Sequence, residues 1–278
     1  MMLQMQDLAG TALARPTAWP ISRRIGLGLL TLLAAFAVLG PVLVTADPAR
    51  QDLSASLAPI GGDFLLGADH YGRSLLARLA YGARLSFGMA LLTMLSAAVP
   101  GLLLGVLAAW HGGVTERALV ALSDIVLALP GLLLVLLLLA FAPGHFLPLY
   151  LGLSLSLWVE FFRVARTITA RLLVEPRIEA SRLLGFGTFY ILRHQVLPEI
   201  APLLLTLASF AMGTAILAIS TLSAISVGLQ PPTPELGSMI VELLPYYAEA
   251  PLAVLMPGIL IFLLVLGLQL TARGGTVR

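Results

Sequence analysis

Six long apolar runs constrain what this chain of 278 residues can fold into. The hydrocarbon core of a bilayer is about 30 Å thick, and about 20 apolar residues cross it as a helix. The six runs are residues 25–44, 85–110, 118–141, 147–162, 200–229 and 252–270. They predict an all-α integral membrane protein with six transmembrane helices, of which the fourth comes from the shortest run.

The composition agrees with a chain surrounded by lipid. Hydrophobic residues make up 59% of the sequence and charged residues 11%, whereas charged residues are about a quarter of an ordinary soluble domain. The net charge of +2 argues against a nucleic-acid binder, which needs basic residues clustered on a polar face. Cysteine is absent and all 16 basic residues are arginine, which excludes disulfides, thiol catalysis, lysine Schiff bases and a standard ATP-hydrolysing P-loop.

The arginines predict the orientation of the helices. If both termini are cytoplasmic, twelve of the 16 arginines lie on the cytoplasmic side of the membrane, as the positive-inside rule requires. Arg23 and Arg24 precede the first run in the manner of a signal peptide. That run has the full membrane width and further spans follow, so we expect a signal anchor that is not cleaved.

One transmembrane domain, residues 25–270, accounts for the pattern. Its polar interruptions are an external segment, a cytoplasmic segment and an external loop, at residues 45–83, 163–199 and 230–251. We expect a cytoplasmic N-terminal segment at residues 1–24 and a cytoplasmic tail at residues 271–278.

The cytoplasmic segment carries the most informative local pattern, at residues 175–198. Pro176 can open a helix, because its missing N–H is not needed in the first turn. Gly185 can end that helix in the left-handed conformation. Thr188 can cap a second helix that ends before Pro198. We therefore predict two short helices with a hinge between them, parallel to the membrane on its cytoplasmic face.

The first of these helices has a compact apolar face. Ala180, Leu183 and Leu184 share this face, and Glu179 lies near the positive helix start, where an acid is favoured. Such a face fits a groove in another protein. It fits equally well an amphipathic helix that rests on lipid headgroups with its arginines toward the phosphates.

The same residues carry a resemblance to a known family. Glu179-Ala180-Ser181-x-x-x-Gly185, followed by His194, Leu197 and Pro198, resembles the E-A-A-x-x-x-G signature of ABC importer permeases. In that family the segment is the coupling helix that docks in a cleft of the cytoplasmic ATPase. The ATPase-coupling residues that the resemblance implies are Glu179, Ala180, Ser181, Arg182, Leu183, Leu184 and Gly185. Ser181 replaces the second alanine, and since serine is also small, docking is expected to survive.

Two further stretches are similar to the peptide and nickel importer group of that family. The first is Gly67-Ala68-Asp69-x-x-Gly72-Arg73-Ser74, followed by Arg78, Gly82, Arg84 and Ser86, which is similar to a G-T-D-x-x-G-R-D segment. The second is the loop at residues 228–237. The acidic tail common in the group is missing. The chain resembles the second permease subunit of oligopeptide, dipeptide and nickel importers, which implies a type I ABC importer permease fold.

The resemblance implies a permease subunit in a bacterial inner membrane. It would form half of the translocation path for peptides or nickel and other metal chelates delivered by an external solute-binding protein. The implied partners are a second homologous permease and two ATP-binding cassette subunits, which bind ATP and Mg²⁺. This chain itself is expected to hold no cofactor, no metal and no ATPase site.

Two alternatives compete with an ATP-driven permease. A secondary transporter driven by an ion gradient needs buried carboxylates near the midplane of several spans. Asp124 and Glu160 are the candidates, and both lie near an end of a run. We expect them to pair with arginines instead, Glu160 with Arg163 on one helix face. A membrane enzyme ranks last, because protease motifs are absent and the four histidines have no ligand spacing.

The fifth run carries a polar stripe. Its members are Thr206, Ser209, Gly213, Ser220 and Ser223. Small and hydroxyl-bearing residues of this kind can line a path for a polar substrate, or can pack helices closely together. Because the resemblance implies that this run lies near the translocation path, we favour lining.

Overall fold

The computed structural model describes residues 20–62 and 64–272. Within these ranges the chain is helical, with two isolated β-bridges and no strand. Most of the predicted N-terminal segment 1–24, up to residue 19, lies outside the described residues. So do residues 273–278 of the predicted tail.

Five helices are long and apolar enough to cross a membrane. They are α2 (Ile21–Leu43), α3 (Leu75–His111), α6 (Phe146–Leu173), the continuous helix Thr188–Ala224, of which α9 (Leu197–Ala224) is the main part, and α11 (Pro251–Ala272). Shorter elements connect them: η1 (Leu53–Ala55), α7 (Pro176–Leu183), α8 (Thr188–Ile191), the π-helical turn η2 (Leu192–Val196), α10 (Leu236–Leu243) and η3 (Leu244–Tyr246).

The third predicted span is broken in two. Helices α4 (Gly113–Leu127) and α5 (Gly131–Leu139) meet at an angle of 73°. Pro130 lies in the break, where it lacks an N–H donor and disfavours a helical conformation in Leu129. The predicted third span, residues 118–141, is thus made of two helices with a bend between them. Counted as one broken span, the pair completes six spans among the described residues.

Two helices extend beyond their apolar runs. Helix α3 begins at Leu75, where Ser74 caps it by accepting a hydrogen bond from the Ala77 N–H. Helix α6 continues past residue 162 to Leu173, so the start of the predicted cytoplasmic segment is a helical extension of the fourth span. Hydropathy marks where lipid contact ends, whereas backbone hydrogen bonding lets a helix continue into water.

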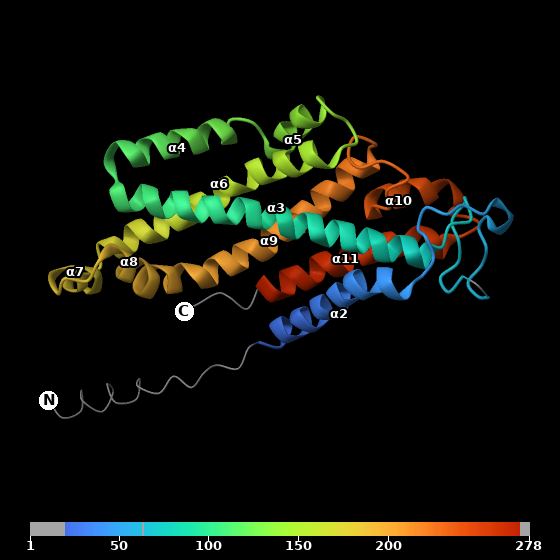
Figure 1. Ribbon diagram of the computed structural model, residues 1–278, viewed down its shortest axis with the longest axis horizontal. Helices are drawn as coiled ribbons and strands as arrows, with labels where there is room; N and C mark the ends of the chain where they lie inside the picture. Colours follow the sequence, from blue (N-terminus) through green and yellow to red (C-terminus); the bar gives the residue numbers. More distant parts are fainter. Residues whose placement is uncertain (1–19, 63, 273–278) are drawn as a thin grey trace.

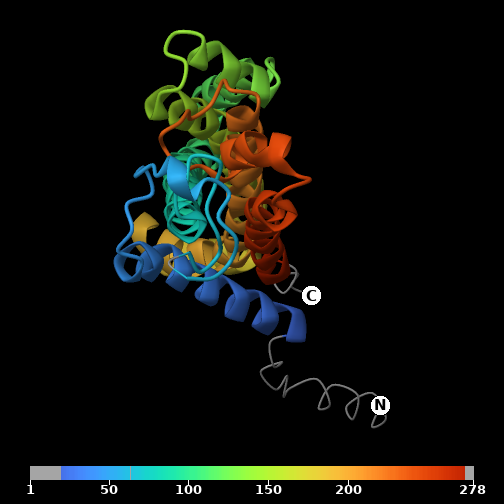
Figure 2. The same ribbon diagram turned by 90° about the vertical axis from the view of Figure 1, so that its right-hand side faces the viewer.

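The bundle has two distinct ends (Figure 1). Helices α7 and α8 lie at one end, together with the start of α4, and α10 and residues 45–74 lie at the other. The start of α2 and the end of α11 both lie on the side of the α7 end, as an even number of spans requires (Figure 1). Figure 2 shows α4 and α5 on one side of the bundle and α2 on the opposite side.

Helix α3 forms the centre of the packing, because it contacts α2, α6 and α9. Its closest approach is to α6. A Cβ atom on Gly101 would lie 2.6 Å from the Trp158 carbonyl oxygen, and one on Gly105 would lie 2.5 Å from that of Phe162. These two glycines therefore let the backbones meet, as small residues do between membrane helices.

Candidate functional site

Helix α7 forms where the sequence predicts a coupling helix. Pro176 occupies its first turn. At its end Gly185 has φ +83°, the Gly185 N–H donates to the Arg182 carbonyl, and the Phe186 N–H donates to the Ser181 carbonyl. These paired hydrogen bonds around a left-handed glycine are a Schellman motif. The predicted start and stop of this helix are thus observed.

One face of α7 is fixed to the body of the protein. Ile178 is fully buried in a cluster with Leu172 of α6 and Ile200 of α9. Ser181 Oγ donates to the Arg177 carbonyl at 3.0 Å and accepts from Gln195 Nε2 at 2.6 Å. Ser181, which departs from the family signature, therefore points inward and attaches α7 to the π-helical turn.

The opposite face of α7 is open. Ala180 is exposed, and Leu183 and Leu184 are 84% and 77% exposed. Aliphatic side chains this exposed in one patch are typical of a surface that contacts a protein or a membrane. Arg182 lies with its guanidinium 5.1 Å from the centroid of the Trp110 ring, which holds it against the end of α3. Glu179 is exposed beside them.

The second predicted helix differs from its prediction. Gly187 is the N-cap of α8, and Thr188 is its first helical residue and forms no cap. The helix also does not end before Pro198 but runs through η2 into α9. In an α-helix the ring of Pro198 would clash with the carbonyl four residues earlier. The π turn widens the backbone there, and the Leu197 N–H donates five residues back to the Leu192 carbonyl.

Exposed ion pairs add to the attachment of α7. Arg177 Nε lies 2.7 Å from Glu175 Oε2, and Arg177 Nη2 lies 3.1 Å from Glu199 Oε1 in the first turn of α9. All three side chains are partly solvated, so each pair contributes little stability.

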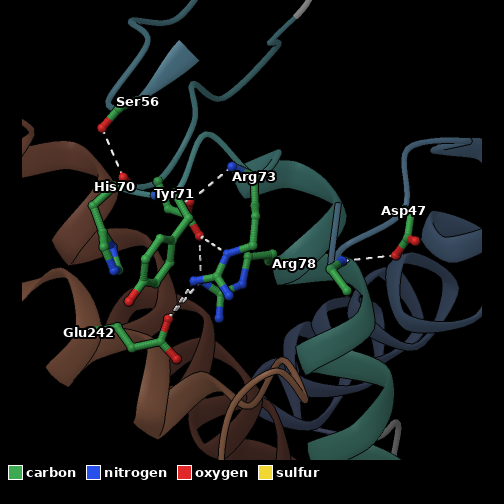
Figure 3. Close-up of polar contacts among 9 residues, drawn as sticks. Asp47, Ser56, His70, Tyr71, Arg73, Arg78 and Glu242 are labelled. Carbon is green, nitrogen blue, oxygen red and sulfur yellow. Dashed lines mark hydrogen bonds and ion pairs between the residues drawn. The ribbon is translucent and has the colours of Figure 1, made fainter. Parts of the chain in front are cut away.

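A buried charge cluster occupies the opposite end of the molecule (Figure 3). Asp69 Oδ2 accepts from Arg73 Nε and from Arg78 Nη1, each at 2.6 Å. Glu242 Oε2 in α10 accepts from Arg73 Nη2 at 2.8 Å and from Arg78 Nη1 at 2.9 Å. Asp69, Arg73 and Arg78 are almost completely buried. The cluster joins the segment before α3, the start of α3 and α10.

The electrostatics of Asp69 follow from its contacts. Burial raises the pKa of Asp69, but the backbone hydrogen bond from Arg73 and the guanidinium groups of Arg78 and Arg73 outweigh burial, so the pKa lies below its usual value. The motif resemblance identified Asp69, Arg73 and Arg78. It missed Glu242, because no local pattern links α10 to a motif more than 160 residues earlier.

The outer members of the polar stripe on α9 form hydrogen bonds within the chain. Ser220 Oγ donates to the buried Glu235 Oε1 at 2.9 Å. Ser223 Oγ accepts from the Leu229 N–H at 3.1 Å. Both serines thereby hold the loop after α9 against the helix. Gly213 is also buried.

The inner members of the stripe are half-buried. Thr206 Oγ1 donates to the Pro202 carbonyl and Ser209 Oγ to the Leu205 carbonyl, both on their own helix. The lining role of the stripe stays a prediction.

Of the two acids in the predicted spans, Asp124 forms an ion pair. Asp124 Oδ1 of α4 accepts from Arg163 Nη2 of α6 at 2.8 Å, which confirms that Asp124 pairs with an arginine. The predicted pairing of Glu160 with Arg163 is not the one formed, because Arg163 reaches across to α4 instead. Residues 20–62 and 64–272 contain no group of three His, Asp or Glu side chains that could hold a metal ion.

The described residues contain five membrane-spanning helices, or six spans with the bent pair, with an exposed apolar helix at one end of the bundle and a buried charge cluster at the other, and these features are those of an integral membrane protein. Residues 101–273 match the family described as binding-protein-dependent transport system inner membrane component. The match covers more than half of the sequence. The chain belongs to this family, and the predicted resemblance to importer permeases is confirmed.

Relatives with known names agree with this assignment. The chain is 34% identical over 255 residues to the di/tripeptide transport system permease protein DppC of Pseudomonas aeruginosa, covering 90% of this chain and 84% of that protein. It is 30% identical over 257 residues to the dipeptide transport system permease protein DppC of Haemophilus influenzae, covering 90% and 87%.

A solved structure shares the fold. The inward-facing MetNI methionine ABC transporter superposes with a TM-score of 0.54 and 21% identity, over 72% of this chain and 96% of that one. The predicted type I importer fold is therefore observed. None of these similarities points to a transporter driven by an ion gradient.

Proposed function

We propose that this chain is a permease subunit of an ATP-driven importer of short peptides, and that α7 is its contact with the ATPase. The exposed face of Ala180, Leu183 and Leu184 is the observation that carries the proposal. Peptide is favoured over a nickel chelate as the substrate, because the similar proteins are named for di- and tripeptide transport.

The proposed assembly has five further parts. A second related permease completes the path, two ATP-binding cassette subunits bind ATP and Mg²⁺, and an external binding protein delivers the peptide. The membrane lipid is the fifth. The arginine distribution supports cytoplasmic termini in a bacterial inner membrane, with α7 on the ATPase side.

The coupling is mechanical. Leu183 and Leu184 sit in a groove of the ATPase, and closure of the two ATPases displaces α7. Because Ile178 and Ser181 attach α7 to the body, and α8 runs through η2 into α9 without a break, the displacement is passed to a whole transmembrane helix. ATP does not touch this chain, so the ATPase biases the inward-open and outward-open states through differential contacts at α7.

Leu183→Asp tests this proposal, with Val114→Asp as the matched control. Val114 lies at the same end of the bundle and is 81% exposed, but it is outside the α7 face. An aspartate at an apolar position that is buried by the ATPase should weaken the binding free energy by at least about 2 kcal/mol, as expected for a hot-spot residue. In the reconstituted complex, ATP-driven peptide uptake should fall at least about tenfold with Leu183→Asp and stay near normal with Val114→Asp.

The opposite result would reject the coupling role. Normal uptake with Leu183→Asp, or equal loss in both variants, would contradict it. Uptake that survives vanadate but collapses with a protonophore would favour a transporter driven by an ion gradient instead.

A further inference from the structure

Two hollows follow one another along α3 and α6. The outer hollow, of about 420 Å³, is lined by Tyr81, Arg84 and Leu92 of α3, by Phe146 of α6 and by the loop at Pro234. It lies toward the α10 end of the bundle.

The inner hollow, of about 430 Å³, is lined by Ser96 of α3, by Tyr150, Ser154 and Trp158 of α6, and by Val126 of α4. Helix α4 forms one side of it through Leu122 and Val126.

The two hollows lie end to end. Leu92 in the outer hollow and Ser96 in the inner one are one turn apart on α3. Phe146 and Tyr150 are one turn apart on α6, and their rings stack with centroids 5.9 Å apart. We call the combined feature the α3–α6 groove. At 1.5 Å per residue, Trp158 lies about 18 Å along α6 from Phe146, roughly halfway across a bilayer.

The outer hollow has an unpaired cation at its rim. Arg84 is exposed, and none of the ion pairs or hydrogen bonds among the described residues involves it. By contrast, its neighbours Arg73 and Arg78 form ion pairs with Asp69 and Glu242 in the buried cluster. A guanidinium beside apolar side chains is suited to bind a carboxylate through two parallel hydrogen bonds, in bidentate geometry.

The inner hollow is lined by polar groups to which a lipid acyl chain could not form a hydrogen bond. Ser96 Oγ and Tyr150 Oη hydrogen-bond each other across it. Ser154 Oγ and Trp158 Nε1 are buried and have no hydrogen-bond partner within the described part of the chain. The indole N–H can only donate. Unpaired polar groups in an apolar site are costly, so an acceptor from a ligand would stabilise them.

We infer that the α3–α6 groove is this chain's half of the translocation path, with two successive stations for a short peptide. Arg84 receives the C-terminal carboxylate at the outer station, and Ser154 and Trp158 receive peptide carbonyls at the inner one. Arg84 and Ser96 are about 18 Å apart along α3, whereas an extended tripeptide spans about 10 Å. One peptide therefore occupies the stations in turn. This inference rests on the proposed peptide importer.

The absence of cysteine allows a direct test of the inner station. In the intact complex in proteoliposomes, Ser154→Cys is treated with a charged thiol reagent during turnover, with and without peptide-loaded binding protein. Ser209→Cys is the matched control, since Ser209 is also half-buried but lies on the α9 stripe. We expect the reagent to modify Ser154→Cys and peptide to slow that reaction at least threefold, with no protection of Ser209→Cys.

Two outcomes would overturn the inner station. If only a lipid-soluble maleimide modified Ser154→Cys, and peptide gave no protection, lipid would fill the groove. If peptide protected Ser209→Cys instead, the path would follow α9.

Arg84→Gln and Arg84→Lys test the outer station. Uptake of a tripeptide is compared with uptake of its C-terminal amide, and the binding protein is unchanged throughout. Arg84→Gln should lower uptake of the free acid about tenfold, the factor that corresponds to about 1.4 kcal/mol, and leave the amide unaffected. Arg84→Lys should restore most of the difference.

Equal effects of Arg84→Gln on both peptides, or none on either, would overturn the carboxylate role. The proposed function has its own readout. If the unaltered complex showed no ATP-driven peptide uptake, the importer proposal would fail. If the unaltered complex took up peptide normally and the Ser154 and Arg84 variants behaved like it, only the role of the α3–α6 groove as the peptide path would be rejected.

Discussion

At the scale of single residues, the buried cluster of Asp69, Arg73, Arg78 and Glu242 holds four charged side chains together at the α10 end of the bundle. Two acids and two bases balance in charge and connect three elements. Taking four charged groups out of water is costly, and removing one member leaves the others unpaired. The cluster therefore specifies how the external segment and α10 sit on α3.

Asp69→Asn should destabilise the protein by about 3 kcal/mol, as expected when one partner of a buried pair is lost. Asp47→Asn is the control, because Asp47 is exposed in the same external segment and accepts only the Ala49 N–H, which asparagine can also accept. Its effect should stay within about 0.5 kcal/mol. Chemical unfolding of the purified protein measures both. Equal stability of the two variants would show that the cluster contributes nothing.

The pH dependence of the same substitution has a definite sign. The pKa of Asp69 is lower in the folded protein than in the unfolded chain, so its stabilisation is present above the unfolded pKa of about 3.9 and is lost as the pH falls through the folded pKa. The stability difference between the unaltered protein and Asp69→Asn should be constant above about pH 5 and shrink below it. A difference that did not change between neutral and acidic pH would contradict this origin.

At the scale of elements, α7 illustrates what sequence can and cannot predict. Pro176 and Gly185 predict its bounds because each acts through its own backbone conformation. The continuation of α8 into α9 was not predictable from Pro198, since the π turn that accommodates the ring depends on packing against α3 and α6. The break at Pro130 is the converse case, where a proline in an apolar run does interrupt the helix.

Gly185→Val tests the importance of the α7 terminus. Nothing lies within 4 Å of an added Cβ, so the cost comes from φ +83°, which a β-branched residue adopts only with a strain of about 1–3 kcal/mol. We expect ATP-driven uptake to fall while membrane insertion stays intact. Gly187→Val is the control, because Gly187 has φ −72° and equally open surroundings. Loss of uptake in the control alone would contradict the account.

At the scale of the whole molecule, six apolar runs and the arginine distribution were sufficient to predict a six-span bundle. They could not predict how deeply each side chain is buried, or which neighbouring helix it faces. The residue types of the α9 stripe predict path lining, which stays a prediction, but they gave no sign that Ser220 and Ser223 would hydrogen-bond to residues that follow α9. The α3–α6 groove carries little sequence signal, because Ser96, Ser154 and Trp158 become a polar set only when two helices pack together.

The account depends most on the contact between α7 and an ATPase. A benzophenone probe attached to Leu183→Cys, in a chain with no other cysteine, reports that contact directly in intact membranes. The account predicts a light-dependent adduct between this 29.4 kDa chain and an ATP-binding cassette subunit. A complex that imports peptide normally, while the probe reacts only with lipid or with nothing, would contradict it.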